Sequence, residues 1–324
     1  MASPGTSIAL VIVLPESEGG ALEGLMPRLR GLRPGPREIL AVGGGQPSGS
    51  PERKLGNRRL RILPVEPNWE AQRREGGLPQ AVAWNRGCSE VTAALVVFLA
   101  HDAVPAGADW LERLTAPLED PQVAAAYGRQ EPLQEEPLSA LRLSERFGLQ
   151  GERHRARLGD PPAGGAPGFS LANAVIRRSV WQAIHFNEHY PIGADREWAR
   201  QVLLSSYTIA YVPEALVRRA EHESIRDLAR NALLQGWNDA RLGSAPADPQ
   251  AELASFARRA AWHLLKTGKG SLLPRLYADT LAQAFAYRLG RRLHRIAPSL
   301  RSRIAPEIAG EEPRRELSEW ERAA

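Results

Sequence analysis

Three short segments place polar or glycine residues directly after an aliphatic run. They are 15–18 after SIALVIVL, 43–50 after REILAV and 101–105 after AALVVFLA. A carboxylate such as Asp102 in the last segment can hold a divalent cation, and a glycine-rich backbone brings its N–H groups close to an anionic ligand. In open α/β sheets, ligands bind beyond the carboxyl ends of the strands. The sequence therefore predicts a ligand-binding crevice formed by these three segments.

The elements that would carry these segments alternate along the chain. Four aliphatic runs predict strands buried on both faces: 7–15, 37–42, 58–65 and 93–100. Residues 78–91 predict a helix, and leucine spacing between 18 and 32 predicts a weaker one, interrupted by Pro27. Alternating strands and helices predict an α/β fold with a mostly parallel central sheet.

Composition sets the broad class of the protein. The chain has 324 residues, of which 43% are hydrophobic and 24% charged, as in ordinary globular proteins. The net charge of +5 favours an anionic partner such as a nucleotide diphosphate or a lipid surface. Arginines are dispersed without interleaved aromatic residues, so we expect no nucleic-acid binding. The single Cys88 excludes an intramolecular disulfide, and without a signal-peptide pattern we expect a cytoplasmic protein.

Two long segments carry a family resemblance. Residues 83–132 contain an Asn-bearing helix, an aliphatic strand, Phe-Leu, a motif ending in Asp-Ala, a Trp-Leu helix and Tyr-Gly-Arg-Gln. Residues 168–217 contain Arg-Arg-Ser-x-Trp, Phe-x-Glu and Tyr-x-Pro-Glu-Ala. Together they resemble family 2 glycosyltransferases of the GT-A fold, especially the rhamnosyltransferase-like branch, over about residues 7–230. The resemblance implies inverting transfer of a sugar from a nucleotide-sugar donor to a saccharide or lipid-linked acceptor in surface glycan synthesis.

The resemblance also assigns roles to individual side chains. Asp195 takes the position of the catalytic base, and Asp102 that of the acid beside a divalent metal, Mg or Mn. His222, aligned with a slip of one residue, is a further metal-ligand candidate. Each has a plainer alternative: a first-turn or N-cap acid for Asp195, a turn-forming acid for Asp102 and a surface histidine for His222.

Donor and acceptor contacts follow from the same resemblance. Besides Asp102, donor contacts are expected from a set of five residues: Pro15, Glu16, Gly43, Gly44 and Arg86. Acceptor contacts are expected from Asn173 and Arg177, whose amide and guanidinium can bind hydroxyl groups or phosphate. The alternative for this pair is a structural strand end followed by a helix start.

Several acidic positions of the family are replaced here. Gly43 and Gly44 stand where acids grip the nucleotide, and Ala100 and Ala194 replace two further acids. One interpretation is an active transferase with a rearranged donor pocket, in which an Asp introduced at Gly43 would tighten nucleotide binding if the backbone is compatible. The other is a catalytically silent relative that serves as a binding or scaffolding partner in glycan assembly.

The last third of the chain differs from the rest. We expect a GT-A domain over residues 1–220, a helical region over 221–310 and a flexible tail over 311–324. Apolar residues at helical spacing in the middle region alternate with basic ones. These helices either pack on the catalytic domain or on a second copy in a homodimer, or lie on the inner face of a membrane through about residues 258–303.

Overall fold

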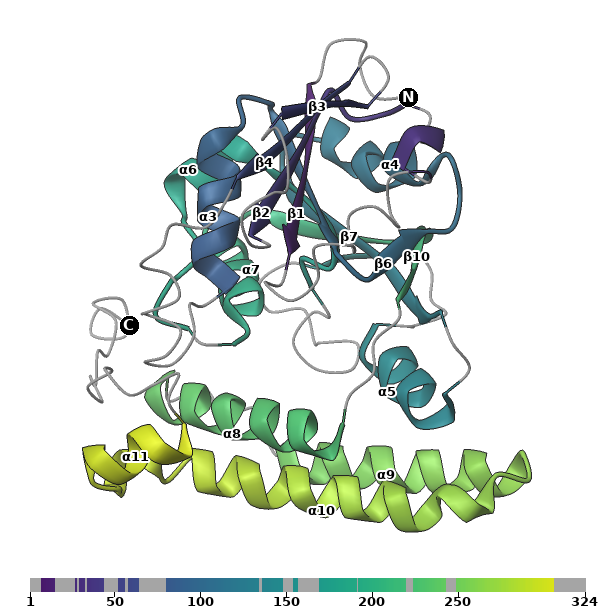
Figure 1. Ribbon diagram of the computed structural model, residues 1–324, viewed down its shortest axis with the longest axis vertical. Coiled ribbons are helices and arrows are strands. Elements are labelled where there is room, and N and C mark those ends of the chain that lie inside the picture. Colours follow the sequence, from purple (N-terminus) through teal and green to yellow (C-terminus); the bar gives the residue numbers. More distant parts are fainter. Residues whose placement is uncertain are drawn as a thin grey trace.

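The fold was analysed in a computed structural model (Figure 1). It describes residues 7–14, 27, 29–32, 34–43, 52–55, 58–63, 80–133, 136–147, 154–156, 169–190, 192–219, 224–242 and 249–305. Four of the predicted site residues lie outside these ranges: Pro15, Glu16, Gly44 and His222.

One ten-stranded sheet organises the first two thirds of the chain, with strand order β3-β4-β2-β1-β5-β9-β7-β10-β6 and β8 paired to β10. Its strands are β1 (Ile8–Leu14), β2 (Glu38–Gly43), β3 (Glu52–Leu55), β4 (Arg58–Leu63), β5 (Leu95–Ala100), β6 (Ala103–Pro105), β7 (Val123–Pro132), β8 (His154–Ala156), β9 (Asn173–Arg177) and β10 (Thr208–Arg219). The pairings give β4, β2, β1, β5, β7 and β10 one common direction, whereas β9 and the short β3, β6 and β8 run the opposite way. The mostly parallel α/β sheet is therefore confirmed.

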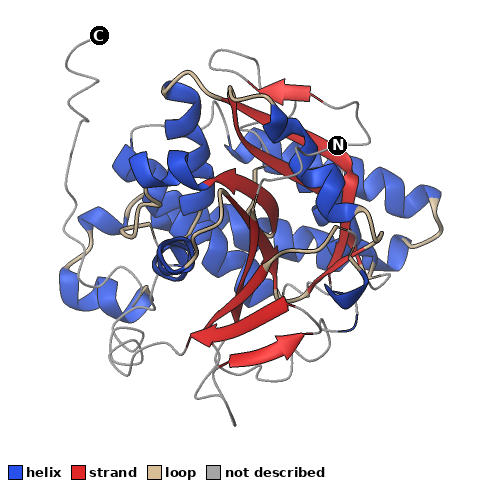
Figure 2. Cartoon of the chain, turned by 90° about the horizontal axis from the view of Figure 1, so that it is seen from above, coloured by secondary structure: helices blue, strands red, loops and turns tan. Residues whose placement is uncertain are grey.

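Both faces of the sheet are covered by helices, as Figure 2 shows in a view from above. The helices of this part are α3 (Gln80–Glu90), α4 (Trp110–Thr115), α5 (Pro137–Phe147), α6 (Arg178–Ala183) and α7 (Ala194–Leu204). Successive residues of β1 belong to different hydrophobic clusters: Val11 packs with residues of α3 and α7, and Ile12 with residues of α4. Because successive side chains of a strand point to opposite faces, a strand buried on both faces must be aliphatic throughout.

A layer of helices lies below the carboxyl ends of the main strands (Figure 1). It consists of α8 (Ile225–Leu242), α9 (Pro249–Lys266), α10 (Leu273–Gly290) and α11 (Pro298–Ile304). α8 and α10 cross at a very short distance. A Cβ atom at Gly236 would lie 2.2 Å from the Tyr287 carbonyl oxygen, and a Cβ atom at Gly290 would lie 2.0 Å from the Leu233 carbonyl oxygen. Any other residue at either position would push the two helices apart.

A chain of hydrogen bonds joins this helical layer to the start of α7. Arg196 Nη2 donates to Gln235 Oε1 at 2.5 Å, and Gln235 Nε2 donates to Asp239 Oδ1 at 2.7 Å. The hydroxyl of Tyr287 in α10 donates to the other oxygen of Asp239 at 2.8 Å. Asn238 adds a second link, donating to the Ile192 carbonyl at 2.6 Å. The loop and first turn of α7 are thus tied through α8 to α10.

Candidate active site

Asp102 lies at the carboxyl end of β5, in the turn before β6. Its carboxylate is held by Arg219 of β10: Nε lies 3.2 Å from each oxygen, and Nη2 lies 3.1 Å from Oδ1. Arg219 Nη1 also donates to Oε1 of the fully buried Gln130 at 3.3 Å. Both charged side chains are mostly buried, which strengthens their attraction relative to a pair in water. The carboxylate is thus matched by a guanidinium within the fold.

Asp195 is the second residue of α7 and belongs to the same edge of the sheet. Its Oδ1 accepts the Arg196 N–H at 2.9 Å and its Oδ2 the Leu171 N–H at 3.4 Å. The carbonyl oxygen of Ala172, the next residue along the chain, accepts a hydrogen bond from the N–H of Ala100 at 3.0 Å. Ala100 lies two positions before Asp102. These contacts bring both acids to the carboxyl end of β5.

Burial raises the pKa of the Asp195 carboxyl group, although the Arg196 charge and the two N–H donors act in the opposite direction. Burial disfavours the charged form of a carboxyl group. A carboxylate with a raised pKa accepts a proton more readily near neutral pH than an ordinary aspartate does. Asp195 therefore combines a place at the carboxyl end of β5 with a raised pKa.

Gly43 ends β2 beside Leu14, the last residue of β1. Its φ is +101°, and a Cβ atom there would lie 2.4 Å from the Leu14 carbonyl oxygen. No side chain fits this position without displacing backbone. The condition under which Asp at Gly43 was expected to tighten nucleotide binding is therefore not met, and only backbone groups are available to a ligand at this point.

Asn173 is fully buried, and its amide is used within the fold. Its Oδ1 accepts the indole N–H of Trp110 at 3.0 Å, while Nδ2 donates to the carbonyls of Arg129 at 3.0 Å and Ala215 at 2.7 Å. The amide thus joins β9 to β7 and β10. These contacts favour the structural alternative over acceptor binding.

Arg177 lies at the opposite end of β9, paired with Leu95 at the start of β5. Its guanidinium donates to the carbonyls of Val123 and Asp120, each at 2.8 Å, and also to that of Leu118. Burial lowers the pKa of Arg177. Because it lies at the amino end of β5, the structural alternative is favoured here too.

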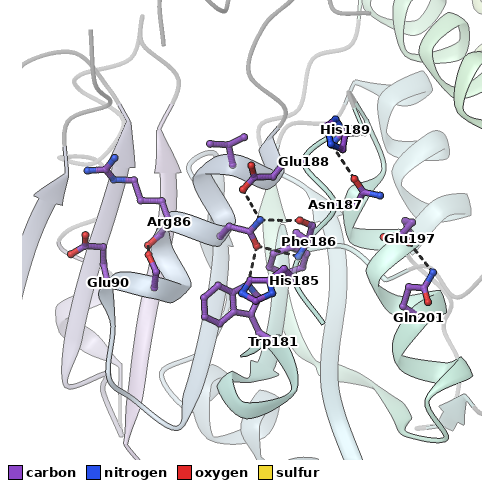
Figure 3. Close-up of a pocket in the computed structure, with 13 residues that line it drawn as sticks. Arg86, Glu90, Trp181, His185, Phe186, Asn187, Glu188, His189, Glu197 and Gln201 are labelled. Atoms are coloured by element: carbon purple, nitrogen blue, oxygen red, sulfur yellow. Dashed lines mark hydrogen bonds between the residues drawn. The ribbon is translucent and has the colours of Figure 1, made fainter. Parts of the chain in front are cut away.

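Arg86 lines a separate pocket between α3, α6 and α7 (Figure 3). The pocket has a volume of about 1020 Å³, and its other polar wall residues include Glu90, His185, His189 and Glu197. Burial raises the pKa of Glu197, whose Oε1 accepts a hydrogen bond from Gln201 at 3.1 Å. Asp102, Asp195 and Gly43 do not line this pocket. The pocket that contains Arg86, a predicted donor contact, thus contains neither of the two acids.

The described residues contain no cluster of metal-ligating side chains. Among them, no three His, Cys, Asp or Glu side chains converge as ion ligands. Asp102, the predicted ligand, instead forms the ion pair with Arg219, and a metal ion would have to compete with that guanidinium for one carboxylate. His222 lies outside the residues described.

Sequence reasoning missed Arg219 and Gln130 as partners of Asp102. Gln130 closes the Tyr-Gly-Arg-Gln motif, so its signal was present but carried no assigned contact.

Comparisons with known proteins agree with this architecture. No protein-family model matches the chain. The O-antigen chain rhamnosyltransferase RfbN of Salmonella typhimurium strain LT2 is 26% identical over 209 residues, covering 61% of this chain and 65% of the relative. WbaN of Salmonella anatum, also named an O-antigen chain rhamnosyltransferase, is 28% identical over 206 residues, covering 60% and 64%. The match thus spans slightly less than two thirds of the length of these relatives.

A solved structure has the same fold. The mannosyltransferase PcManGT from Pyrobaculum calidifontis, determined in complex with GDP-Man and Mn²⁺, superposes with a TM-score of 0.54 at 18% identity, covering 89% of this chain and 86% of that one. The chain therefore has the GT-A glycosyltransferase fold. Its sequence is similar to those of the two O-antigen chain rhamnosyltransferases, in keeping with the resemblance of its motifs to the rhamnosyltransferase-like branch of family 2.

Proposed function

We propose that this protein is an inverting glycosyltransferase that moves a sugar from a nucleotide-sugar donor to a saccharide or lipid-linked acceptor in surface glycan synthesis. The observation that carries the proposal is Asp195, a carboxylate whose pKa burial raises and which shares the carboxyl end of β5 with the Asp102–Arg219 pair. Similarity to two O-antigen chain rhamnosyltransferases supports a sugar as the transferred group.

Asp195 acts as the general base in this proposal. One of its oxygens accepts the proton of the acceptor hydroxyl while the hydroxyl oxygen bonds to the anomeric carbon. The bond from that carbon to the donor diphosphate breaks, and its electron pair leaves with the nucleoside diphosphate. Attack from the side opposite the leaving group inverts the anomeric configuration. The N–H groups of Leu171 and Arg196 hold the carboxylate in place, which preserves its alignment for proton transfer.

Arg219 supplies positive charge near the leaving diphosphate. Asp102 and Gln130 fix the guanidinium from two sides, so it is pre-oriented before a donor arrives. Such a positioned cation stabilises charge that develops on phosphate oxygens. The charge stabilisation in this proposal therefore rests on a side chain of the protein itself.

A panel of nucleotide sugars, with rhamnose donors included, tests the proposal. A true donor should raise the melting temperature of the protein by mass action and be consumed when a glycan acceptor is present. The linkage formed should have the anomeric configuration opposite to that of the donor, which NMR measures. Binding of a donor without transfer to any acceptor would instead support the catalytically silent alternative.

A further inference from the structure

The exposed side of α10 is apolar. Tyr277, Leu281 and Phe285 follow one another at intervals of four residues, so they share one face of the helix. Their surfaces are 52%, 70% and 71% exposed. The opposite side of the helix, with Leu276 and Tyr287, is buried in the fold. α10 is thus apolar on two sides, although packing among the residues that the structure describes uses only one.

α9 shows the same arrangement beside it. Trp262 and Leu265 are 68% and 58% exposed, whereas Ala261 and Leu264 are buried against the rest of the fold. We refer to the exposed side chains of Tyr277, Leu281 and Phe285 in α10 and of Trp262 and Leu265 in α9 as the outer face. Large exposed apolar side chains gathered on neighbouring helices mark an interaction site, because leaving them in water is unfavourable.

Charge is concentrated on the same segment. Residues 249–305 contain eleven Lys or Arg and two acidic residues, a formal charge of +9. The whole chain carries +5, so all other residues together carry −4. One of the two acids, Asp279, is buried and paired with Arg142 of α5, which leaves Glu252 near the start of α9 as the exposed one. The segment therefore presents cations and almost no exposed acids.

Basic residues border the outer face itself. Arg288 lies three residues beyond Phe285 and continues its row on α10, and Lys266 and Lys269 follow Leu265 at the end of α9. All three are exposed. Aromatic and aliphatic side chains flanked by Lys and Arg are the pattern of a helix that lies in the plane of an anionic membrane surface. None of the described helices has the length and apolarity needed to span a bilayer.

We propose that the outer face docks the protein onto an anionic lipid surface, with Trp262, Leu281 and Phe285 entering the headgroup boundary and the bordering cations contacting lipid headgroups. A second copy of the chain is the main competing occupant. Pairing two such faces would bring two segments of +9 together, and that repulsion opposes a dimer but favours an anionic surface. The proposal stands apart from sugar transfer, since docking requires neither donor nor acceptor.

Vesicle flotation of the full chain tests the docking proposal. Vesicles of phosphatidylcholine alone are compared with vesicles in which about one third of the lipid is phosphatidylglycerol. The parent protein should float with the anionic vesicles and be released when NaCl is raised from about 0.1 M to about 0.5 M, because salt screens exposed charges. Binding no stronger to anionic than to neutral vesicles would overturn the proposal.

Matched variants test whether vesicle binding depends on the outer face or on exposed apolar side chains in general. Leu281→Gln with Phe285→Gln should lower partitioning onto anionic vesicles by about tenfold or more, because two apolar anchors are lost and Gln preserves helix propensity. Lys266→Glu with Lys269→Glu should weaken anionic binding but leave neutral vesicles unaffected. The control Leu204→Gln removes an apolar side chain that is 44% exposed on α7 and should bind like the parent.

Two outcomes with these variants would contradict the lipid proposal. The first is outer-face variants that partition like Leu204→Gln while circular dichroism shows all of them folded. The second is a parent protein that light scattering finds dimeric and that Leu281→Gln with Phe285→Gln renders monomeric, since the face would then bind a second copy. Because each changed side chain is at least partly exposed, all variants should keep the parent melting temperature to within a few degrees.

Discussion

Replacing Asp195 with asparagine should abolish most transfer while leaving the fold and donor binding in place. A lost general base costs about 10²- to 10⁴-fold in kcat. That factor corresponds to about 2.7 to 5.4 kcal/mol of transition-state stabilisation. Donor affinity should stay within about threefold of the parent value, because the proton is taken from the acceptor and not from the donor.

The local contacts predict that stability will change little. Asparagine retains one acceptor oxygen, which can keep the 2.9 Å bond from the Arg196 N–H. It loses the long 3.4 Å contact from the Leu171 N–H, at a cost of about 1 kcal/mol or less. Asparagine also removes a charge whose burial is unfavourable, as the raised pKa of Asp195 shows. The two effects oppose each other, so loss of turnover would reflect chemistry and not unfolding.

The assay follows release of nucleoside diphosphate and donor binding across a range of pH. In the parent protein, kcat/KM should fall as pH drops through the raised pKa of Asp195, because only the ionised carboxylate accepts a proton. Asp195→Asn should remove this acidic limb together with the activity.

Glu197→Gln is the matched control for Asp195→Asn. Burial raises the pKa of Glu197 too, yet it lies two residues further along α7 and lines the separate pocket. Its loss should change kcat by less than about threefold, because residues two apart in a helix do not share a face. Full activity of Asp195→Asn, or an equal loss in Glu197→Gln, would refute the assignment of the base.

Three further predictions concern Gly43, Asp102 and Arg177. Gly43→Ala should lower the free energy of unfolding by about 2 to 4 kcal/mol, through backbone strain at positive φ and overlap with a carbonyl oxygen; a denaturation midpoint like that of the parent would contradict this. Because Arg219 already neutralises Asp102, EDTA should leave kcat within about twofold of its value with Mn²⁺; complete loss with EDTA and recovery with Mn²⁺ would show that a metal ion takes part in transfer. Arg177→Gln should destabilise the fold by about 1 to 3 kcal/mol, because buried carbonyls lose their donor, and should leave the acceptor KM unchanged; a raised acceptor KM at unchanged stability would restore the binding role.

The central sheet could be predicted from the sequence because burial on both faces leaves a local trace. β1 and β5 are aliphatic or aromatic at every position, which no exposed strand needs to be. β9 was harder to orient, since nothing local reveals that Asn173 must meet three elements and that its strand runs antiparallel. Its Asn was therefore equally compatible with a ligand contact.

The candidate site was predictable in position but not in its pairings. Asp102 follows an apolar run, which fixes its place at a strand end. Its partner Arg219 is 117 residues away, and only the assembled sheet brings β10 beside β6. The glycine at 43 looked like a lost acid, whereas its positive φ and the Leu14 carbonyl explain why no side chain is tolerated. Likewise, helical spacing in α10 could not tell which of two apolar sides would be buried.

The hydrogen-bond chain from Arg196 through Gln235 and Asp239 to Tyr287 has a consequence for acceptor length. It ties the first turn of α7 to α8, and α8 packs closely on α10. If α10 rests on a lipid surface, α8 and α10 hold the carboxyl edge of the sheet away from that surface by at least the roughly 8 to 10 Å that separates two packed helices. The helical layer would then set a minimum acceptor length: an acceptor anchored in the lipid meets Asp195 only when its chain of sugars is long enough to span that height.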